Sequence, residues 1–139
     1  MKNSTNGRDI AQRFAAALDR DDIESAASML APDCHYDNGA TILKGPDAII
    51  NSYRESSERA RRLLDEVRYE STIQQGAGNQ AAITFIDHLR KDTLTYVYRC
   101  RQMVEINEAG RIASIRHEEL DGEREALHRF FKSCGIEAS

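Results

Sequence analysis

LAPDCHYD, residues 30–37, is the stretch that decides the fold, together with the helix start GPDAI at residues 45–49. Two short helical patterns precede residue 30, and one long helical pattern begins at Pro46. From Val67 onward the apolar residues alternate with period two, which is typical of strands. This order of elements predicts a domain that mixes α-helices with a largely antiparallel sheet.

The helical patterns carry their own start and stop signals. Residues 8–18 have an amphipathic spacing. Asp21 and Glu24 resemble a capping box, and the second helix that they begin is expected to stop at Pro32. Pro46 suits the first turn of a third and longer helix, whose outer face carries charges of both signs.

The second half of the chain predicts a strand meander and a closing helix. The expected strands cover residues 67–73, 81–87, 94–106 and 113–119. Asp121 can cap a terminal helix over about residues 122–134, which presents Leu127, Phe130 and Phe131 on one face. We expect this apolar face to dock over the mouth of the domain or against a partner subunit.

Composition narrows the class of protein. The 139 residues suffice for a single domain, and the net charge of -4 gives no overall positive field for a nucleic acid. The first seven residues are polar where a signal peptide is apolar, and no apolar run approaches the length of a membrane span. Three widely spaced cysteines favour reduced thiols over a disulfide framework. We therefore expect a cytoplasmic protein with no nucleic-acid or membrane partner.

The order of elements around residues 30–49 resembles the nuclear transport factor 2-like superfamily, which includes ketosteroid isomerases and SnoaL-like polyketide cyclases. The resemblance covers a core of about residues 8–120, so residues 1–139 are expected to form a single SnoaL-like domain with an added C-terminal helix. It implies a cone-shaped α+β fold, in which N-terminal helices pack on a curved, mostly antiparallel sheet around a small-molecule pocket. It also implies a homodimer formed through the sheet exterior, where Val97 and Met103 lie.

Counting in twos along the expected strands places several polar side chains on registers that look into the cone. They are His35, Asp37, Asp87, Gln102, His117 and Glu119. In a concave and mostly apolar site, a few convergent polar groups orient a ligand, and burial raises the pKa of a carboxylate toward the range that suits proton abstraction. The alternative is that these groups lie at wet strand ends, where solvent or arginines satisfy them.

The resemblance to ketosteroid isomerases implies roles for three of these positions. Asp37 corresponds to the catalytic base, and Gln102 stands where those enzymes carry a protonated aspartic acid that donates to an oxyanion. Phe14 replaces their hydroxyl-donating tyrosine, which leaves the Gln102 amide as a weaker donor. Apart from the resemblance, we expect His117 to be a second acid or base or a polariser of the substrate. Phe14, Tyr53, Phe85 and Tyr98 are expected to form the walls of the pocket, with His35, Asp87 and Glu119 also contacting the ligand.

Two function classes remain open at this point. The first is an enzyme that moves a proton next to a carbonyl in an isomerisation, cyclisation or dehydration. The second is a non-catalytic ligand-binding or dimerisation module. We expect no cofactor and no metal, although the pairs His35-x-Asp37 and His117-x-Glu119 would together make a zinc or iron ligand set if their strands met.

Overall fold

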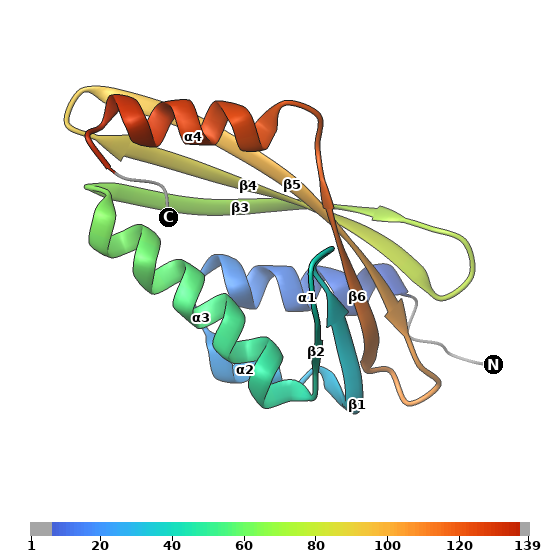
Figure 1. Cartoon of the computed structure of the whole chain (residues 1–139). Helices are drawn as coiled ribbons and strands as arrows, with labels where there is room; N and C mark the ends of the chain where they lie inside the picture. The colour runs from blue at the N-terminus through green and yellow to red at the C-terminus, as the bar shows by residue number, and fades with distance from the viewer. Residues whose placement is uncertain (1–6, 137–139) are drawn as a thin grey trace.

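The computed structural model describes residues 7–136, which form four helices and six strands (Figure 1). In chain order they are α1 (Gly7–Asp19), α2 (Ile23–Ala27), β1 (Leu30–Asp37), β2 (Ile42–Lys44), α3 (Pro46–Leu63), β3 (Glu66–Gln75), β4 (Gln80–Lys91), β5 (Leu94–Ile106), β6 (Ile112–Glu119) and α4 (Glu123–Ser133). None of the helices in this range is long and apolar enough to cross a membrane.

All six strands belong to one curved sheet in the order β2-β1-β6-β5-β4-β3. Neighbouring strands are antiparallel except β1 and β6, which are parallel. The long strands β3, β4 and β5 form a continuous antiparallel meander that extends well beyond the short β1–β2 edge (Figure 1). The α+β cone that the sequence predicts is therefore the fold that forms.

The second helix is shorter than its sequence pattern predicts. α2 ends at Ala27, and Leu30 already begins β1, so Pro32 lies inside a strand and does not terminate the helix. The cap is also one residue later than expected, because the Asp22 side chain, and not that of Asp21, accepts a hydrogen bond from the Ser25 backbone N–H at 3.3 Å. A five-residue helix has room for only one turn of the predicted apolar stripe.

The junction between β2 and α3 is set by two adjacent residues. Gly45 has φ of +87°, a conformation that suits glycine, and Pro46 occupies the first turn of α3. The Gly45 N–H donates to the Cys34 carbonyl at 2.8 Å, which ties the helix start to β1. α3 ends at Leu63, so Val67 belongs to the following strand, as its period-two pattern indicates.

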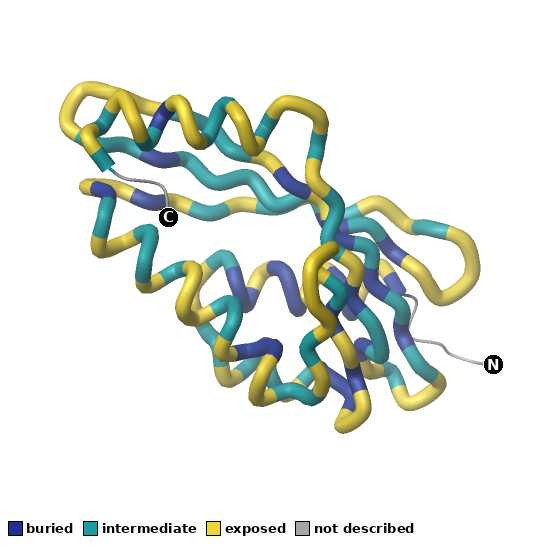
Figure 2. The backbone as a smooth tube through the Cα atoms, in the orientation of Figure 1, coloured by how far each residue is buried: buried dark blue, intermediate teal, exposed yellow. Residues whose placement is uncertain are grey.

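Two apolar clusters hold the layers together (Figure 2). The larger one joins α1, α3 and the concave face of the sheet, and Phe14 and Ile49 are fully buried in it. The smaller one lies at the other end of the sheet, where Leu64, Leu89 and Phe130 pack beneath α4. The concave face between these two clusters is left for a cavity.

α4 docks on the sheet of its own chain. Gly122, with φ of +79°, is its N-cap and provides no side-chain hydrogen bond, so Asp121 does not cap the helix as predicted. The first residue of the helix, Glu123, accepts hydrogen bonds from the Tyr96 hydroxyl at 2.8 Å and the Arg99 backbone N–H at 3.1 Å. Phe130 stacks on Tyr96 with ring centroids 5.7 Å apart. The helix thus extends the wall of the cone beyond α3.

Candidate functional site

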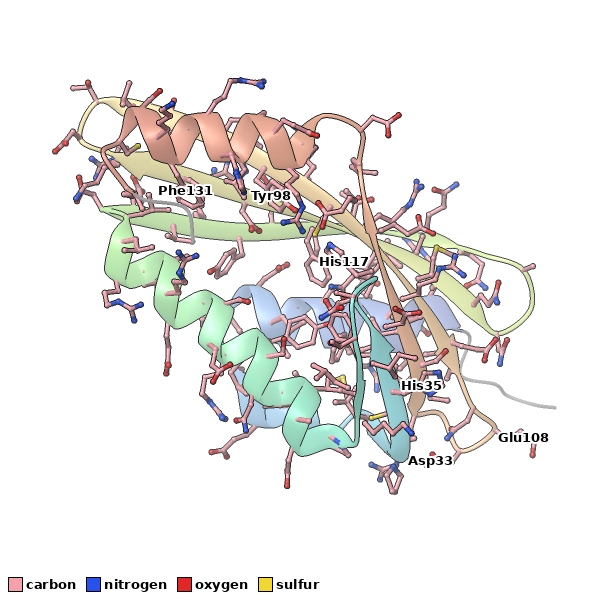
Figure 3. All side chains as sticks on the ribbon, in the orientation of Figure 1. Asp33, His35, Tyr98, Glu108, His117 and Phe131 are labelled. Atoms are coloured by element: carbon pink, nitrogen blue, oxygen red, sulfur yellow. The ribbon has the colours of Figure 1, made fainter. Side chains whose placement is uncertain are left out.

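A cavity of about 330 Å³ lies between α1, α3, the start of α4 and the concave face of the sheet. Its volume is at the lower end of the range typical of small-molecule sites. Figure 3 shows Tyr98 and His117 in this central region, between α4 on one side and α1 and α3 on the other. The lining residues are Leu18, Asp19, Asp21, Ile23, Tyr36, Ser52, Tyr53, Ser56, Ser57, Ala60, Tyr69, Phe85, Asp87, Tyr98, Cys100, Gln102, His117, Glu119 and Arg124.

Gln102 is the centre of a hydrogen-bond network on one wall of the cavity. Only 3% of its surface is exposed, so its amide needs partners within the protein. Its Oε1 accepts from the Tyr53 hydroxyl at 2.6 Å, and its Nε2 donates to the Tyr36 hydroxyl oxygen at 3.0 Å. The second Nε2 hydrogen points to His117 Nδ1 at 3.3 Å. Both amide hydrogens are therefore used, and Gln102 has none left for the ligand oxygen that the sequence analysis assigned to it.

The network continues from His117 to the rim of the cavity. Because an amide nitrogen only donates, His117 Nδ1 is an acceptor and the ring hydrogen is on Nε2, which lies 2.6 Å from Glu119 Oε2. Glu119 also accepts from Tyr98 at 3.2 Å and from Arg124 at 3.2 Å. Burial raises the pKa of Glu119, but the His117, Arg124 and Tyr98 contacts outweigh it, so the pKa lies below its usual value. Both ring nitrogens of His117 are therefore engaged within the protein.

Asp87 lies on a different wall of the cavity, and its pKa is shifted in the direction opposite to that of Glu119. It occupies β4 between Tyr69 of β3 and Tyr98 of β5, and within residues 7–136 its carboxylate has no hydrogen-bond partner. Burial, and then the negative charge of Asp19, raise the pKa of Asp87 to about 7, against a smaller opposite effect of His88. At neutral pH the carboxylate is therefore ionised in a large fraction of molecules yet still basic enough to accept a proton.

Asp19 at the end of α1 accompanies Asp87. Its Oδ2 accepts a hydrogen bond from the Ser71 hydroxyl at 2.6 Å, whereas its buried Oδ1 has no partner within the described chain. Burial raises the pKa of Asp19, as the charge of Glu70 does, while the Ser71 hydrogen bond lowers it. Two incompletely bonded carboxylates thus border the same cavity, and the negative charge of Asp19 disfavours ionisation of Asp87.

Cys100 forms the floor between these two walls. Burial raises the pKa of its thiol to about 12, and the charges of Asp87 and Glu119 add to the effect. The thiol is therefore protonated at neutral pH and is not a nucleophile. Its position shows that Asp87 and the Glu119 end of the network face a common space.

Seven of the ten site residues expected from the sequence line the cavity. They are Tyr53, Phe85, Asp87, Tyr98, Gln102, His117 and Glu119. Phe14 does not line it: the ring is fully buried behind Tyr53 and contacts it edge-on, with centroids 5.9 Å apart. Phe14 is therefore a core residue that supports the cavity wall.

His35 and Asp37 are the clear corrections. Along β1 the buried residues are Cys34 and Tyr36, so the side chains that alternate with them face the outer side of the sheet. Tyr36 is paired with buried Ile115, whereas Asp37 is paired with exposed Arg116. The Asp37 carboxylate accepts from the Gly39 N–H at 2.9 Å in the turn that follows. The prediction that Asp37 faces the cavity as its base is wrong by one residue of register.

The same register separates the two histidine–carboxylate pairs. His35 and Asp37 lie on the outer face of β1, and His117 and Glu119 lie on the inner face of β6. Figure 3 shows His35 away from His117. The four-ligand metal set that the two motifs suggested is therefore not assembled, and within residues 7–136 no three histidine, cysteine or acidic side chains gather in a metal-binding arrangement.

Tyr36 and Asp19 are the important lining residues that the sequence analysis missed. For Tyr36 the signal was available, because Cys34 and Tyr36 are the apolar members of the period-two pattern in residues 30–37. Asp19 had no comparable signal, since it ends a helix at a position where an acidic residue is usually solvated.

Comparison with known proteins agrees with this architecture. A family model described as the SnoaL-like domain matches residues 11–115. Among solved structures, a proposed polyketide cyclase from Xanthomonas campestris pv. campestris has a TM-score of 0.68 and 14% identity, covering 89% of this chain and 96% of its own. A proposed polyketide cyclase from Pseudomonas putida KT2440 has a TM-score of 0.63 and 16% identity, covering 87% and 96%.

An LEH-like epoxide hydrolase from M. tuberculosis is similar to the same degree, with a TM-score of 0.63, 21% identity, and coverage of 91% of this chain and 92% of its own. No curated protein matches the sequence. At such low identities the solved structures establish the fold alone, and the family is established by the match that covers most of the chain. The chain belongs to the SnoaL-like domain family.

Proposed function

We propose that this protein binds a small, largely apolar ketone in the cavity and transfers a proton at the carbon next to the carbonyl. The observation that carries the proposal is the Asp87 carboxylate, which borders the cavity, lacks a hydrogen-bond partner among residues 7–136 and has a pKa of about 7. A carboxylate of this kind matches the requirement for a general base at neutral pH.

The charges of the cavity indicate which ligands it accepts. Four acidic side chains, those of Asp19, Asp21, Asp87 and Glu119, border the cavity, and Arg124 at the rim is already bound to Glu119. An anionic ligand would meet like charge, so the lining disfavours anionic ligands. The aromatic walls, including Tyr69, Phe85 and Tyr98, suit a molecule with flat apolar surface.

In the proposed step, Asp87 first removes a proton from the ligand and then donates one back. The Asp87 carboxylate takes the proton from the α-carbon, and the electrons of the C–H bond form the C=C bond of an enolate while the carbonyl oxygen takes the negative charge. Protonated Asp87 then either exchanges its proton with solvent and returns a solvent-derived one to the same carbon, or, where the ketone carries a β,γ-C=C bond, delivers the proton to the γ-carbon of the resulting dienolate. The first outcome is isotope exchange and the second is isomerisation, and neither requires a cofactor.

The test uses 2-tetralone, a bicyclic ketone with acidic α-protons, incubated with the protein in D₂O and followed by NMR. We expect catalysed exchange of the α-protons by the wild-type protein and a loss of roughly 10²-fold or more in Asp87→Asn. Asp37→Asn is the matched control, because it makes the same chemical change on the outer face of the sheet and should leave the rate intact. Equal rates in wild type and Asp87→Asn, or a loss only in Asp37→Asn, would contradict the proposal.

We also propose that two copies associate through the outer face of the sheet. Val97 and Met103 lie on the face of β5 opposite Tyr98 and Gln102, and both are half-buried already in the single chain. Arg101 and Arg116 both pair with Glu118 at 2.9 Å on the same face, so the charges of this face are largely compensated.

A cytoplasmic location is likewise a proposal, supported by three cysteines that are all free thiols.

A further inference from the structure

We propose that the Tyr36 hydroxyl is the hydrogen-bond donor that binds the carbonyl oxygen of the ligand, and that Gln102 fixes it in this donating role. The inference rests on the proposed function for the class of ligand. It assigns to Tyr36 the role that the sequence analysis gave to Gln102.

The first step is the burial of Tyr36. Only 7% of its surface is exposed, and it borders the cavity together with Tyr53, Cys100 and Gln102. Its hydroxyl oxygen accepts a hydrogen bond from Gln102 Nε2 at 3.0 Å. Within residues 7–136, however, its own hydrogen has no acceptor. An unused donor in a buried position is costly unless something else accepts it.

The second step is the direction of the hydrogen bonds around Gln102. The Tyr53 hydroxyl donates to Oε1, and the two Nε2 hydrogens go to Tyr36 and His117. His117 in turn donates to Glu119, which holds the ring in the tautomer that accepts from Gln102. Since Gln102 presents a hydrogen to the Tyr36 oxygen, the Tyr36 hydrogen must point elsewhere, and the cavity is the remaining direction.

The third step is the state of the hydroxyl. Burial raises the pKa of Tyr36, and the negative charge of Glu119 adds to the effect, so the hydroxyl keeps its proton at neutral pH. As negative charge builds on the ligand oxygen, the hydrogen bond that the Tyr36 hydroxyl donates to it becomes stronger. The Tyr36 oxygen then also accepts more strongly from Gln102. Tyr53 is not equivalent, because its hydrogen is already donated to Gln102.

The placement relative to Asp87 completes the argument. Tyr36, Cys100 and Asp87 all line the same cavity, so the three residues border one space. A ketone whose oxygen binds Tyr36 would extend its α-carbon across Cys100 toward Asp87. The donor would then act where negative charge develops in the reaction.

A matched pair of probes tests this assignment. The probes are 2-tetralone and 2-methylenetetralin, the hydrocarbon in which a methylene group replaces the carbonyl oxygen at nearly the same shape. We expect Tyr36→Phe to weaken 2-tetralone binding roughly 5- to 10-fold, as suits the loss of one buried hydrogen bond, and to change 2-methylenetetralin binding less than about 2-fold. Tyr96→Phe, which removes a partly buried hydroxyl that donates to Glu123 and does not border the cavity, is the control and should affect both probes little.

A measurement on the wild-type protein avoids any concern about folding of the variant. The infrared C=O stretch of bound 2-tetralone should lie at lower frequency than in a hydrocarbon solvent, and the shift should vanish in Tyr36→Phe. Equal weakening of both probes, an unshifted carbonyl band in the wild type, or no saturable binding of 2-tetralone would overturn the assignment. Asp87→Asn should retain the shifted band while losing proton exchange, which separates failure of Tyr36 as donor from failure of Asp87 as base.

Discussion

At the scale of single residues, the carboxylates of Asp87 and Asp37 differ in their hydrogen bonding and in their surroundings. The Asp37 carboxylate accepts a hydrogen bond from the Gly39 N–H in the neighbouring turn. The Asp87 carboxylate lies between two tyrosines of the neighbouring strands and has no such donor within residues 7–136. A carboxylate without donors in a partly dry site holds its proton more tightly. The difference comes entirely from the register of the strands that carry them.

This environment makes a prediction about stability. The pKa of Asp87 rises from 3.8 in the unfolded chain to about 7 in the fold, so the folded state binds more protons between these values. The contribution of Asp87 to stability should be greatest below about pH 4, fall as the pH rises toward 7, and then level off, with a total change of at most about 4 kcal/mol. Asp87→Asn should therefore raise the melting temperature relative to wild type by several degrees more at pH 8 than at pH 4. A constant difference between the two proteins across this range would argue against a raised pKa.

How much of the site the sequence predicts differs from strand to strand. On β4, β5 and β6 the alternation of apolar and polar residues predicts the inner registers of Asp87, Gln102 and His117, because each strand continues into a buried segment with a clear pattern. On β1 the resemblance to the family suggested Asp37, although the apolar alternation of Cys34 and Tyr36 and the observed burial favour Tyr36. Hydrogen-bond direction, which decides the role of Gln102, depends on partners far apart in sequence and has no local signal.

At the scale of elements, α4 illustrates which features sequence patterns capture well. Its bounds, Glu123–Ser133, follow from a compact apolar face and from Gly135 just beyond its end. Its docking place did not follow, since the same face fits a partner subunit equally well. The contacts of Phe130 with Tyr96 and Phe131 assign it to its own sheet. For α2 the sequence did not predict the end of the helix, because five residues contain too little pattern to fix where it stops.

The docking of α4 predicts a measurable loss of stability. Phe130 is 8% exposed and belongs to the smaller apolar cluster, so Phe130→Ala should destabilise the fold by about 3 kcal/mol, near the lower end for a buried phenylalanine at a domain edge. Removing residues 122–139 should lower the melting temperature as well. Urea denaturation measures the first effect, and the control Lys132→Ala on the exposed side of α4 should change little. Unchanged stability in Phe130→Ala would mean that α4 does not pack on the sheet as described.

At the scale of the whole molecule, the two faces of the sheet have divided roles. The concave face carries the cavity, and the outer face carries compensated charges around half-buried Val97 and Met103. Apolar groups on such a face are typical of an interface between identical copies. The proposed dimer would leave the cavities of both copies open and independent, because each cavity is lined from within one chain.

The outer face predicts a homodimer in sedimentation experiments at tens of micromolar, roughly the working range for a stable interface. Val97→Arg should shift the protein to monomer, because it adds an unpaired charge among residues that would be buried. Glu58→Arg on the exposed side of α3 is the control and should leave the dimer intact. A wild-type protein that sediments only as a monomer in this range would rule out the interface.

The pH dependence of α-proton exchange from 2-tetralone is the sharpest test of Asp87 as the base, because it reports the protonation state of the group that accepts the proton. If Asp87 is the base, the wild-type rate should rise with pH through an inflection near 7 and then level off, as the carboxylate becomes ionised. Asp87→Asn should lose both the rate and the inflection, while Asp37→Asn should retain both. A wild-type profile without an inflection between about pH 6 and 8, or one that persists in Asp87→Asn, would contradict the assignment of Asp87 as the base.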